Sequence, residues 1–153
     1  MAFKIVILVA VLSVLVPLRG QAQAAGQGVQ PQPIEVTHAD AAVIFVRYSG
    51  LFDRYIKGDE ALNECVAFLN KTGIYFGLLE VVNGSEFTPG DCARVMGQMN
   101  LVFSGEAEYL AGKVKLPIDI DSWEEFCILN DVKYVQGYQN LVATLVMLRN
   151  LSS

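Results

Sequence analysis

Apolar residues recur at steps of three and four along most of the chain beyond residue 36, and this spacing is typical of amphipathic helices. It predicts five helices: one from about 37 to 55, one from about 59 to 70, one that begins at 88, one that begins at 121, and one from about 138 to 150. Short extended pieces at 78–82 and 132–135 are compatible with the pattern, but no sheet is required. The predicted fold class is therefore all-α.

Two of the predicted helices begin with the same capping pattern. Thr37 is followed three residues later by Asp40, and Thr88 is followed by Asp91, which is the Thr-x-x-Asp form of a capping box. Pro89 stands at the first helical position, where a missing backbone N–H has no partner to lose. Both threonines are therefore predicted to be N-caps.

These two helix starts belong to a longer internal similarity. Residues 36–44 can be laid on 87–95 at an offset of 51, and residues 64–77 on 124–137 at an offset of 60. Two matches in the same order favour a duplication with an insertion in the second copy. The domain is thus expected to hold repeat one at about 36–86, repeat two at about 87–138, and a closing helix at about 138–150. That helix closes the core or docks a second copy as a homodimer.

The beginning of the chain has the pattern of an export signal. Lys4 precedes an aliphatic run of about fourteen residues, which is short for a membrane span of about 20 residues. Ala22 and Ala24 form the small-x-small pattern that signal peptidase cleaves, so residues 1–24 are predicted to be a signal peptide. An uncleaved membrane anchor is the alternative. Residues 25–35 are expected to be a flexible leader, residues 36–153 a single helical domain, and the location secreted or periplasmic.

The excess of acidic over basic residues excludes one class of partner. The full chain has a formal charge of −5, and removal of Lys4 and Arg19 leaves nine basic residues against sixteen acidic ones, a charge of −7. Nucleic-acid binding requires a basic surface, so this class is excluded.

The single histidine and the three cysteines are the candidates for chemistry. His38 lies in a first helical turn, where a solvent-exposed position is expected, and two-histidine zinc sites are excluded. Cys65, Cys92 and Cys127 fall on apolar helix faces, which favours buried thiols. A Cys65–Cys127 disulfide with one spare thiol, or an intermolecular bond, are the alternatives. A Cys92–His38 nucleophile pair lacks an orienting group or an oxyanion motif.

An acidic stretch near the fourth helix raises the question of calcium. Asp119, Asp121, Glu124 and Glu125 lie close together, but no glycine follows and Trp123 interrupts them. Capping of the helix by Asp121 and Glu124 explains the stretch more simply. No metal and no cofactor is predicted.

The turn that joins the two units resembles that of a known family. Residues 73–77 (GIYFG) and 83–91 (NGSEFTPGD) are similar to the passage from one S-layer homology (SLH) repeat into the next. The resemblance implies a non-enzymatic extracytoplasmic module that holds proteins to cell-wall polymers. The Arg of the family's Thr-Arg-Ala-Glu run is replaced by His38 in one unit and Pro89 in the other, so the resemblance does not extend to the forked donor that binds an anionic glycan. Two units are visible where the family commonly has three.

Three functions follow from this pattern. The first is a structural or binding module for a protein partner or a cell-envelope polymer. The second is a carrier with a pocket between the repeats for a small apolar ligand, and the third is a small secreted enzyme. Aromatic residues near the turns either stack on a ligand or pack the two units together. The candidate binding surface comprises His38, Asp40, Asp91, Tyr75, Phe76, Trp123, Tyr134 and Tyr138.

Overall fold

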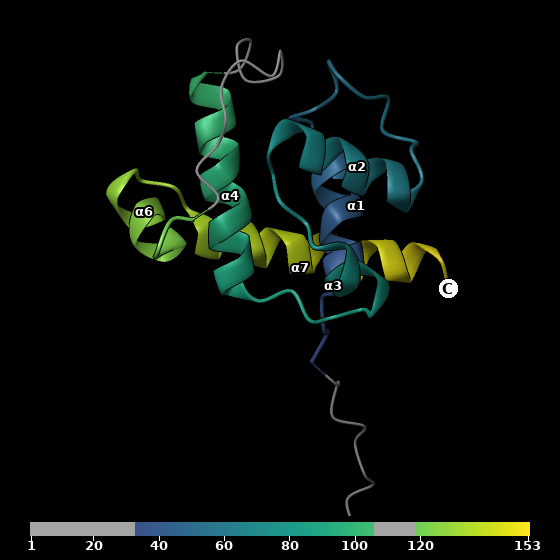
Figure 1. Ribbon diagram of the computed structural model, residues 1–153. Coiled ribbons are helices and arrows are strands. Elements are labelled where there is room, and N and C mark those ends of the chain that lie inside the picture. Colours follow the sequence, from purple (N-terminus) through teal and green to yellow (C-terminus); the bar gives the residue numbers. More distant parts are fainter. Residues whose placement is uncertain (1–32, 106–118) are drawn as a thin grey trace, which may run out of the picture. The chain divides into compact units, whose positions relative to one another are not determined.

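The computed structural model describes residues 33–105 and 119–153, and in these ranges all regular structure is helical (Figure 1). The predicted signal peptide and residues 25–32 of the predicted leader lie outside the described residues. The all-α class is confirmed. The helices, in chain order, are α1 (His38–Tyr48), α2 (Leu62–Thr72), α3 (Leu78–Val82), α4 (Pro89–Ser104), α6 (Trp123–Leu129) and α7 (Tyr134–Leu151).

Both predicted capping boxes are present. The backbone N–H of Asp40 donates to the hydroxyl of Thr37 at 3.1 Å, and that of Asp91 donates to the hydroxyl of Thr88 at 3.2 Å. Each aspartate in turn accepts a hydrogen bond from the backbone N–H of its threonine. The starts of α1 and α4 are therefore fixed by local sequence, as the pattern predicts. Pro89 is the first residue of α4.

The starts of α1 and α4 also lie side by side. Thr37 and Glu86 form an isolated antiparallel bridge, in which the N–H of Phe87 donates to the carbonyl of Val36 at 2.7 Å. The N–H of His38 donates to the carbonyl of Ser85 at 3.0 Å. This short pairing joins two helix starts that are about fifty residues apart in sequence, and it creates the site described below.

The predicted end of the first helix and the predicted start of the fourth helix are wrong. The first helix ends at Tyr48 instead of continuing to about 55, because Ser49 caps it and Gly50 follows with a φ of 69° in the left-handed region. The N-cap of α6 is Ser122, whose hydroxyl accepts from the N–H of Glu125 at 3.2 Å, and not Asp121.

The two possible extended pieces are helical or irregular instead. Residues 78–82 form the additional helix α3, so five helices were too few. The last helix begins at Tyr134, four residues before the expected start, and the expected end of repeat two at 138 therefore falls inside α7. The N–H of Gly137 donates to the carbonyl of Lys133, which shows that the helix already includes this segment.

The core is divided into two clusters of buried side chains. The larger cluster is formed by α1, α2, α4 and α7, by Val81 of α3 and by the loops around Ile74 and Phe87, and Leu141 and Leu145 bring α7 into it. The smaller one lies between α4 and α6 around Trp123 and Cys127. Figure 1 shows α7 crossing behind α1 and α4, and it contacts both.

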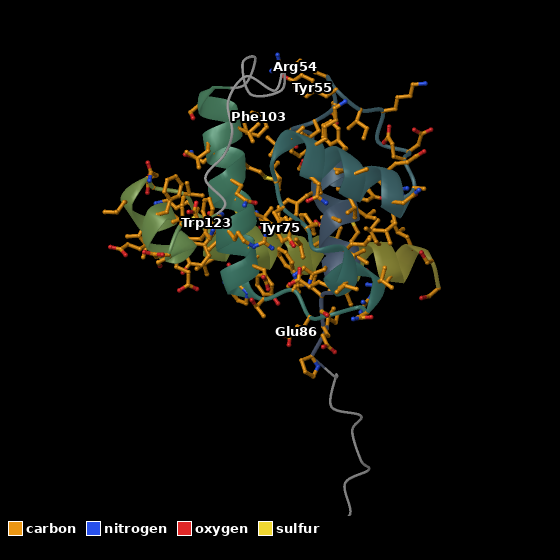
Figure 2. All side chains as sticks on the ribbon, in the orientation of Figure 1. Arg54, Tyr55, Tyr75, Glu86, Phe103 and Trp123 are labelled. Carbon is orange, nitrogen blue, oxygen red and sulfur yellow. The ribbon has the colours of Figure 1, made fainter. Side chains whose placement is uncertain are left out.

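The α4–α6 packing depends on a glycine. A Cβ at Gly97 would lie 2.6 Å from a ring carbon of Trp123 and 3.2 Å from one of Phe126. Figure 2 shows Trp123 in the space between α6 and α4. Only a residue without a side chain lets the indole approach the α4 backbone this closely.

The expected duplication remains a prediction. Helix α1 packs on α2, and α4 packs on α6, which is the pairing expected of two helix–loop–helix units. The aligned leucines have different environments, however: Leu69 is fully buried, whereas Leu129 is 78% exposed. Gly77 precedes the five-residue α3, whereas its counterpart Gly137 lies within α7.

Candidate functional site

His38 is buried, with 3% exposure, so the expectation that it faces solvent is wrong. The Thr37–Glu86 bridge places the carbonyl of Ser85 3.0 Å from its Nδ1. The rings of Phe87 and Phe76 lie edge-on to the imidazole, with centroids at 5.2 and 6.3 Å. The imidazole therefore packs as part of the core.

The second imidazole nitrogen faces two carboxylates. Nε2 lies 3.7 Å from an oxygen of Asp91 on α4 and 3.9 Å from one of Glu80 on α3, and it has no hydrogen-bond partner. Partial burial by itself raises the pKa of Asp91, but the hydrogen bonds from Thr88 and the neighbouring His38 and Arg94 outweigh it, and this pKa is lowered. Three helices thus meet at one ionic cluster.

Arg94 and Tyr75 complete this cluster. The guanidinium lies 3.7 Å from an oxygen of Asp91 and 5.6 Å from the ring centroid of Tyr75, and it donates to the backbone carbonyl of Tyr75. Tyr75 lies close to α4, as Figure 2 shows. The cation is therefore already engaged by groups of the chain itself.

The loop that carries Tyr75 and Phe76 is held by two amides. The side chain of Asn70 accepts from the N–H of Phe76 at 2.9 Å and donates to the carbonyl of the same residue at 3.0 Å. The fully buried Gln98 accepts from the N–H of Tyr75 at 2.9 Å. These contacts fix the chain that leads from α2 into α3.

The candidate binding surface is therefore dispersed. The cluster unites His38, Asp91, Tyr75 and Phe76, but Phe76 and Trp123 are 1% and 9% exposed and serve as core residues. Asp40 caps α1 and lies 3.6 Å from Arg149. Tyr134 and Tyr138 are half-buried on α7, and burial raises the pKa of Tyr138.

The three cysteines are free and buried. Cys65 lies in the larger core cluster and Cys127 in the smaller one, so the alternative of a disulfide between them is wrong. The thiol of Cys92 points to the carbonyl of Tyr134 at 3.6 Å, and burial raises its pKa to about 12. Such a thiol stays protonated and is a poor nucleophile.

An apolar groove that was not predicted from the sequence lies between α2 and α3. Its cavity is about 610 Å³. Beside it, Leu78, Leu79 and Val82 are 69%, 75% and 72% exposed, and Leu62 is 37% exposed. The signal in the sequence is the run LLEVV of residues 78–82, which is too apolar for a surface turn and too short to bury itself. The groove is lined by Ala61, Leu62, Asn63, Val66, Ala67, Asn70, Leu78, Val81 and Val82.

Two other hollows are open to solvent. One of about 300 Å³ lies between α1, α4 and α7, where a pocket between the two predicted repeats is expected. Another of about 560 Å³ lies where α6 turns into α7, beside Ile128, Val132 and Val135. Within residues 33–105 and 119–153, no group of three or more His, Cys, Asp or Glu side chains is arranged to hold a metal ion.

Comparisons with known proteins leave the family open. No protein-family model matches the chain, and neither the curated proteins nor the solved structures gave a significant match. Among the described helices, none combines the length and apolar character that a membrane crossing requires.

Proposed function

We propose that the chain is a non-enzymatic, extracytoplasmic binding module that docks a protein partner on the α2–α3 face. The observation that carries this proposal is the exposure of Leu78, Leu79 and Val82 beside an apolar groove. Each exposed leucine or valine gains about 1.5–3 kcal/mol when it is fully buried. Contiguous exposed apolar side chains mark interaction surfaces, whereas isolated ones are ordinary.

The shape and charge of this face favour one kind of partner. A groove between two helices suits the apolar side of an amphipathic helix. Asp59 and Glu60 precede α2 and Glu64 lies in its first turn, and the chain without its predicted signal has a charge of −7. Basic residues that flank the apolar segment of the partner would speed association.

The surroundings of His38 and Arg94 and the lining of the α2–α3 groove disfavour a cell-wall polymer, which is the ligand that the SLH resemblance suggests. His38, which stands at the family's Arg position, is buried, and Arg94 is engaged by Asp91 and Tyr75. The groove offers only the side chains of Asn63 and Asn70 as polar lining, where a sugar chain needs several hydrogen-bonding groups. The scaffold role is thus proposed with a protein as its ligand.

The non-enzymatic part of the proposal rests on the candidate nucleophile and base. The thiol of Cys92 has a pKa of about 12 and is directed to a backbone carbonyl. His38 is walled in by Phe76, Phe87 and Ser85. A general base must reach the proton that it abstracts, and this burial prevents such contact.

A second candidate is a carrier of a small apolar ligand. The volume of the α2–α3 groove, about 610 Å³, falls within the range of small-molecule sites, about 300–1,000 Å³. Its open form favours a protein segment, because carrier sites enclose most of their ligand. The hollow expected between the repeats is only about 300 Å³.

Binding of the neutral apolar dye Nile red to the purified protein tests the proposed face. The wild type should bind the dye saturably, and Val82→Glu should lose this binding without loss of helical circular dichroism. The matched control is Leu129→Glu on α6, a residue 78% exposed, which should retain binding. Equal binding by wild type and Val82→Glu would overturn the proposal. A stoichiometric apolar molecule seen in the native mass spectrum would support the carrier instead.

A further inference from the structure

Helix α7 has one covered face and one that no described helix covers. Leu141 and Leu145 point into the core, with 3% and 5% exposure, where α1 and α4 cross the helix. The opposite side is exposed over the whole length of the helix and has Ala143 at its centre. The exposed residues of this side, here called the α7 stripe, are Gln136, Gln139, Asn140, Ala143, Met147 and Asn150.

The α7 stripe carries no charge. Arg149 is the single charged residue in α7, and it turns toward Asp40 and the carbonyl of Glu35 at the side of the helix. This exposed face is thus uncharged in a chain with a formal charge of −5. Two acidic molecules repel each other, and contact through the uncharged α7 stripe brings no like charges together. Depletion of charge is also typical of interface centres.

The residues of α7 are arranged symmetrically about Ala143. Met147 and Gln139 lie four residues to either side, and Leu151 and Val135 lie eight residues to either side. In an antiparallel pair of helices related by a twofold axis at Ala143, each residue meets its symmetric counterpart. Gln136 would then face Asn150 of the second copy, and their amides can exchange hydrogen bonds.

The hollow at the start of α7 fits the end of the same helix in a second copy. Leu151 is 77% exposed, and it would lie beside Val135 of the other molecule. Val135, Ile128 and Val132 line the hollow of about 560 Å³, whose charged residues, Asp131 and Lys133, already pair with each other. In such a pair, the exposed Leu151 would therefore be buried in an apolar recess of the second copy.

The geometry points to a homodimer in which two α7 helices pack antiparallel about Ala143, each placing Leu151 in the Ile128–Val132–Val135 recess of the other. This surface is separate from the α2–α3 face and goes beyond the function proposed above. The small side chain of Ala143 allows the two helices to approach closely at the axis.

Cysteines introduced into α7 test how the two α7 helices are aligned in the proposed dimer. Ala143→Cys should form a disulfide-linked dimer on mild oxidation, because a residue on the axis lies beside its own copy. Gln136→Cys is the matched control, since it lies on the same stripe but about 21 Å along the helix from its copy in the antiparallel pair. The native cysteines are buried and should stay unlinked. Cross-linking of Gln136→Cys as readily as Ala143→Cys, or of neither, would overturn the proposal.

The mass of the purified protein in solution gives an independent test. Light scattering should give twice the monomer mass for the wild type, and Ala143→Glu should halve it because two carboxylates would meet at the axis. Leu79→Glu, an exposed change on α3, should keep the dimer mass, so failure here is distinguishable from failure of the α2–α3 proposal. A monomeric wild type, or a dimeric Ala143→Glu, would overturn the dimer. Unchanged circular dichroism of Ala143→Glu shows that the helical fold survives.

Discussion

Nε2 of His38 lies 3.7 Å from a carboxylate oxygen of Asp91, although the two residues lie in the first turns of different helices. The Thr37–Glu86 bridge brings the two helix starts together, and the carboxylate both caps α4 and faces the imidazole of α1. The Asp91 side chain thus makes both a local contact within its own helix and a tertiary contact with a residue of another helix. This explains why a residue predicted as a cap also belongs to the ionic cluster.

Asp91→Asn should destabilise the protein by about 1 kcal/mol at pH 7, a typical value for a lost helix-start interaction. The pKa of Asp91 is lowered in the folded state, so its ionised form stabilises the fold above the ordinary aspartate pKa of about 4. This contribution is lost as the pH falls through the lower, folded-state pKa. Urea unfolding should therefore show a difference in the free energy of unfolding between wild type and variant at pH 7. This difference should be smaller near pH 2.5. Glu35→Gln, at an exposed carboxylate, is the control, and an equal difference at both pH values would argue against the assigned role.

Alanine at two helical glycines should have opposite effects. Gly97→Ala places a methyl group 2.6 Å from the rigid indole of Trp123 and should destabilise the protein by about 1–3 kcal/mol, as overpacked cores do. Gly137→Ala meets the end of the flexible Met96 side chain, which can move aside. It should be neutral or stabilising by up to about 1 kcal/mol through helix propensity. The urea unfolding midpoint of each variant, compared with that of the wild type, measures these effects. A destabilised Gly137→Ala together with a neutral Gly97→Ala would contradict the packing described.

Asn70→Asp should loosen the loop before α3. The substitution keeps the acceptor for the N–H of Phe76 but replaces the donor to its carbonyl by a negative charge, so a cost of about 1–3 kcal/mol is expected. Asn63→Asp introduces the same change at an exposed position on α2 and is the matched control. Thermal unfolding should show a lower Tm for Asn70→Asp alone. Equal Tm values in the two variants would mean that the amide clamp does not hold this loop.

The thiols should be inert in the folded protein. Burial raises the pKa values of Cys65 and Cys127, and that of Cys92 to about 12, so few thiolates exist at pH 8. Ellman's reagent should react slowly with the native protein and rapidly with three thiols per chain in guanidinium chloride. Reaction of a single thiol in denaturant would reveal a disulfide and contradict the free-thiol arrangement.

The sequence was informative where structure is decided locally. The capping boxes at Thr37 and Thr88 involve residues three apart, and both are found as predicted. The N-cap of the fourth predicted helix was misplaced by one residue, because Ser122 competes with Asp121 for the cap and nothing local decides between them. The end of α1 was missed because the buried Phe52 continues the apolar pattern beyond Gly50.

The site depended on contacts that no local pattern contains. His38 is buried by Ser85 and Phe87, which are about fifty residues away, so its first-turn position gave a misleading expectation of exposure. Aromatic character alone did not separate the exposed Tyr75 from its buried neighbour Phe76. The α2–α3 face was missed because the apolar run at 78–82 is also compatible with a short extended piece, and no helix was predicted there.

Photo-crosslinking from position 79 tests the docking surface most directly. Benzoylphenylalanine in place of Leu79, which is 75% exposed on α3, is irradiated in the cells that produce the chain. The account predicts a discrete adduct with another protein, identified by mass spectrometry, that is lost when Val82→Glu is added and is not formed from the same probe at Leu51, an exposed position outside α2 and α3. The absence of a protein adduct at position 79, or the same adduct from both positions, would contradict it.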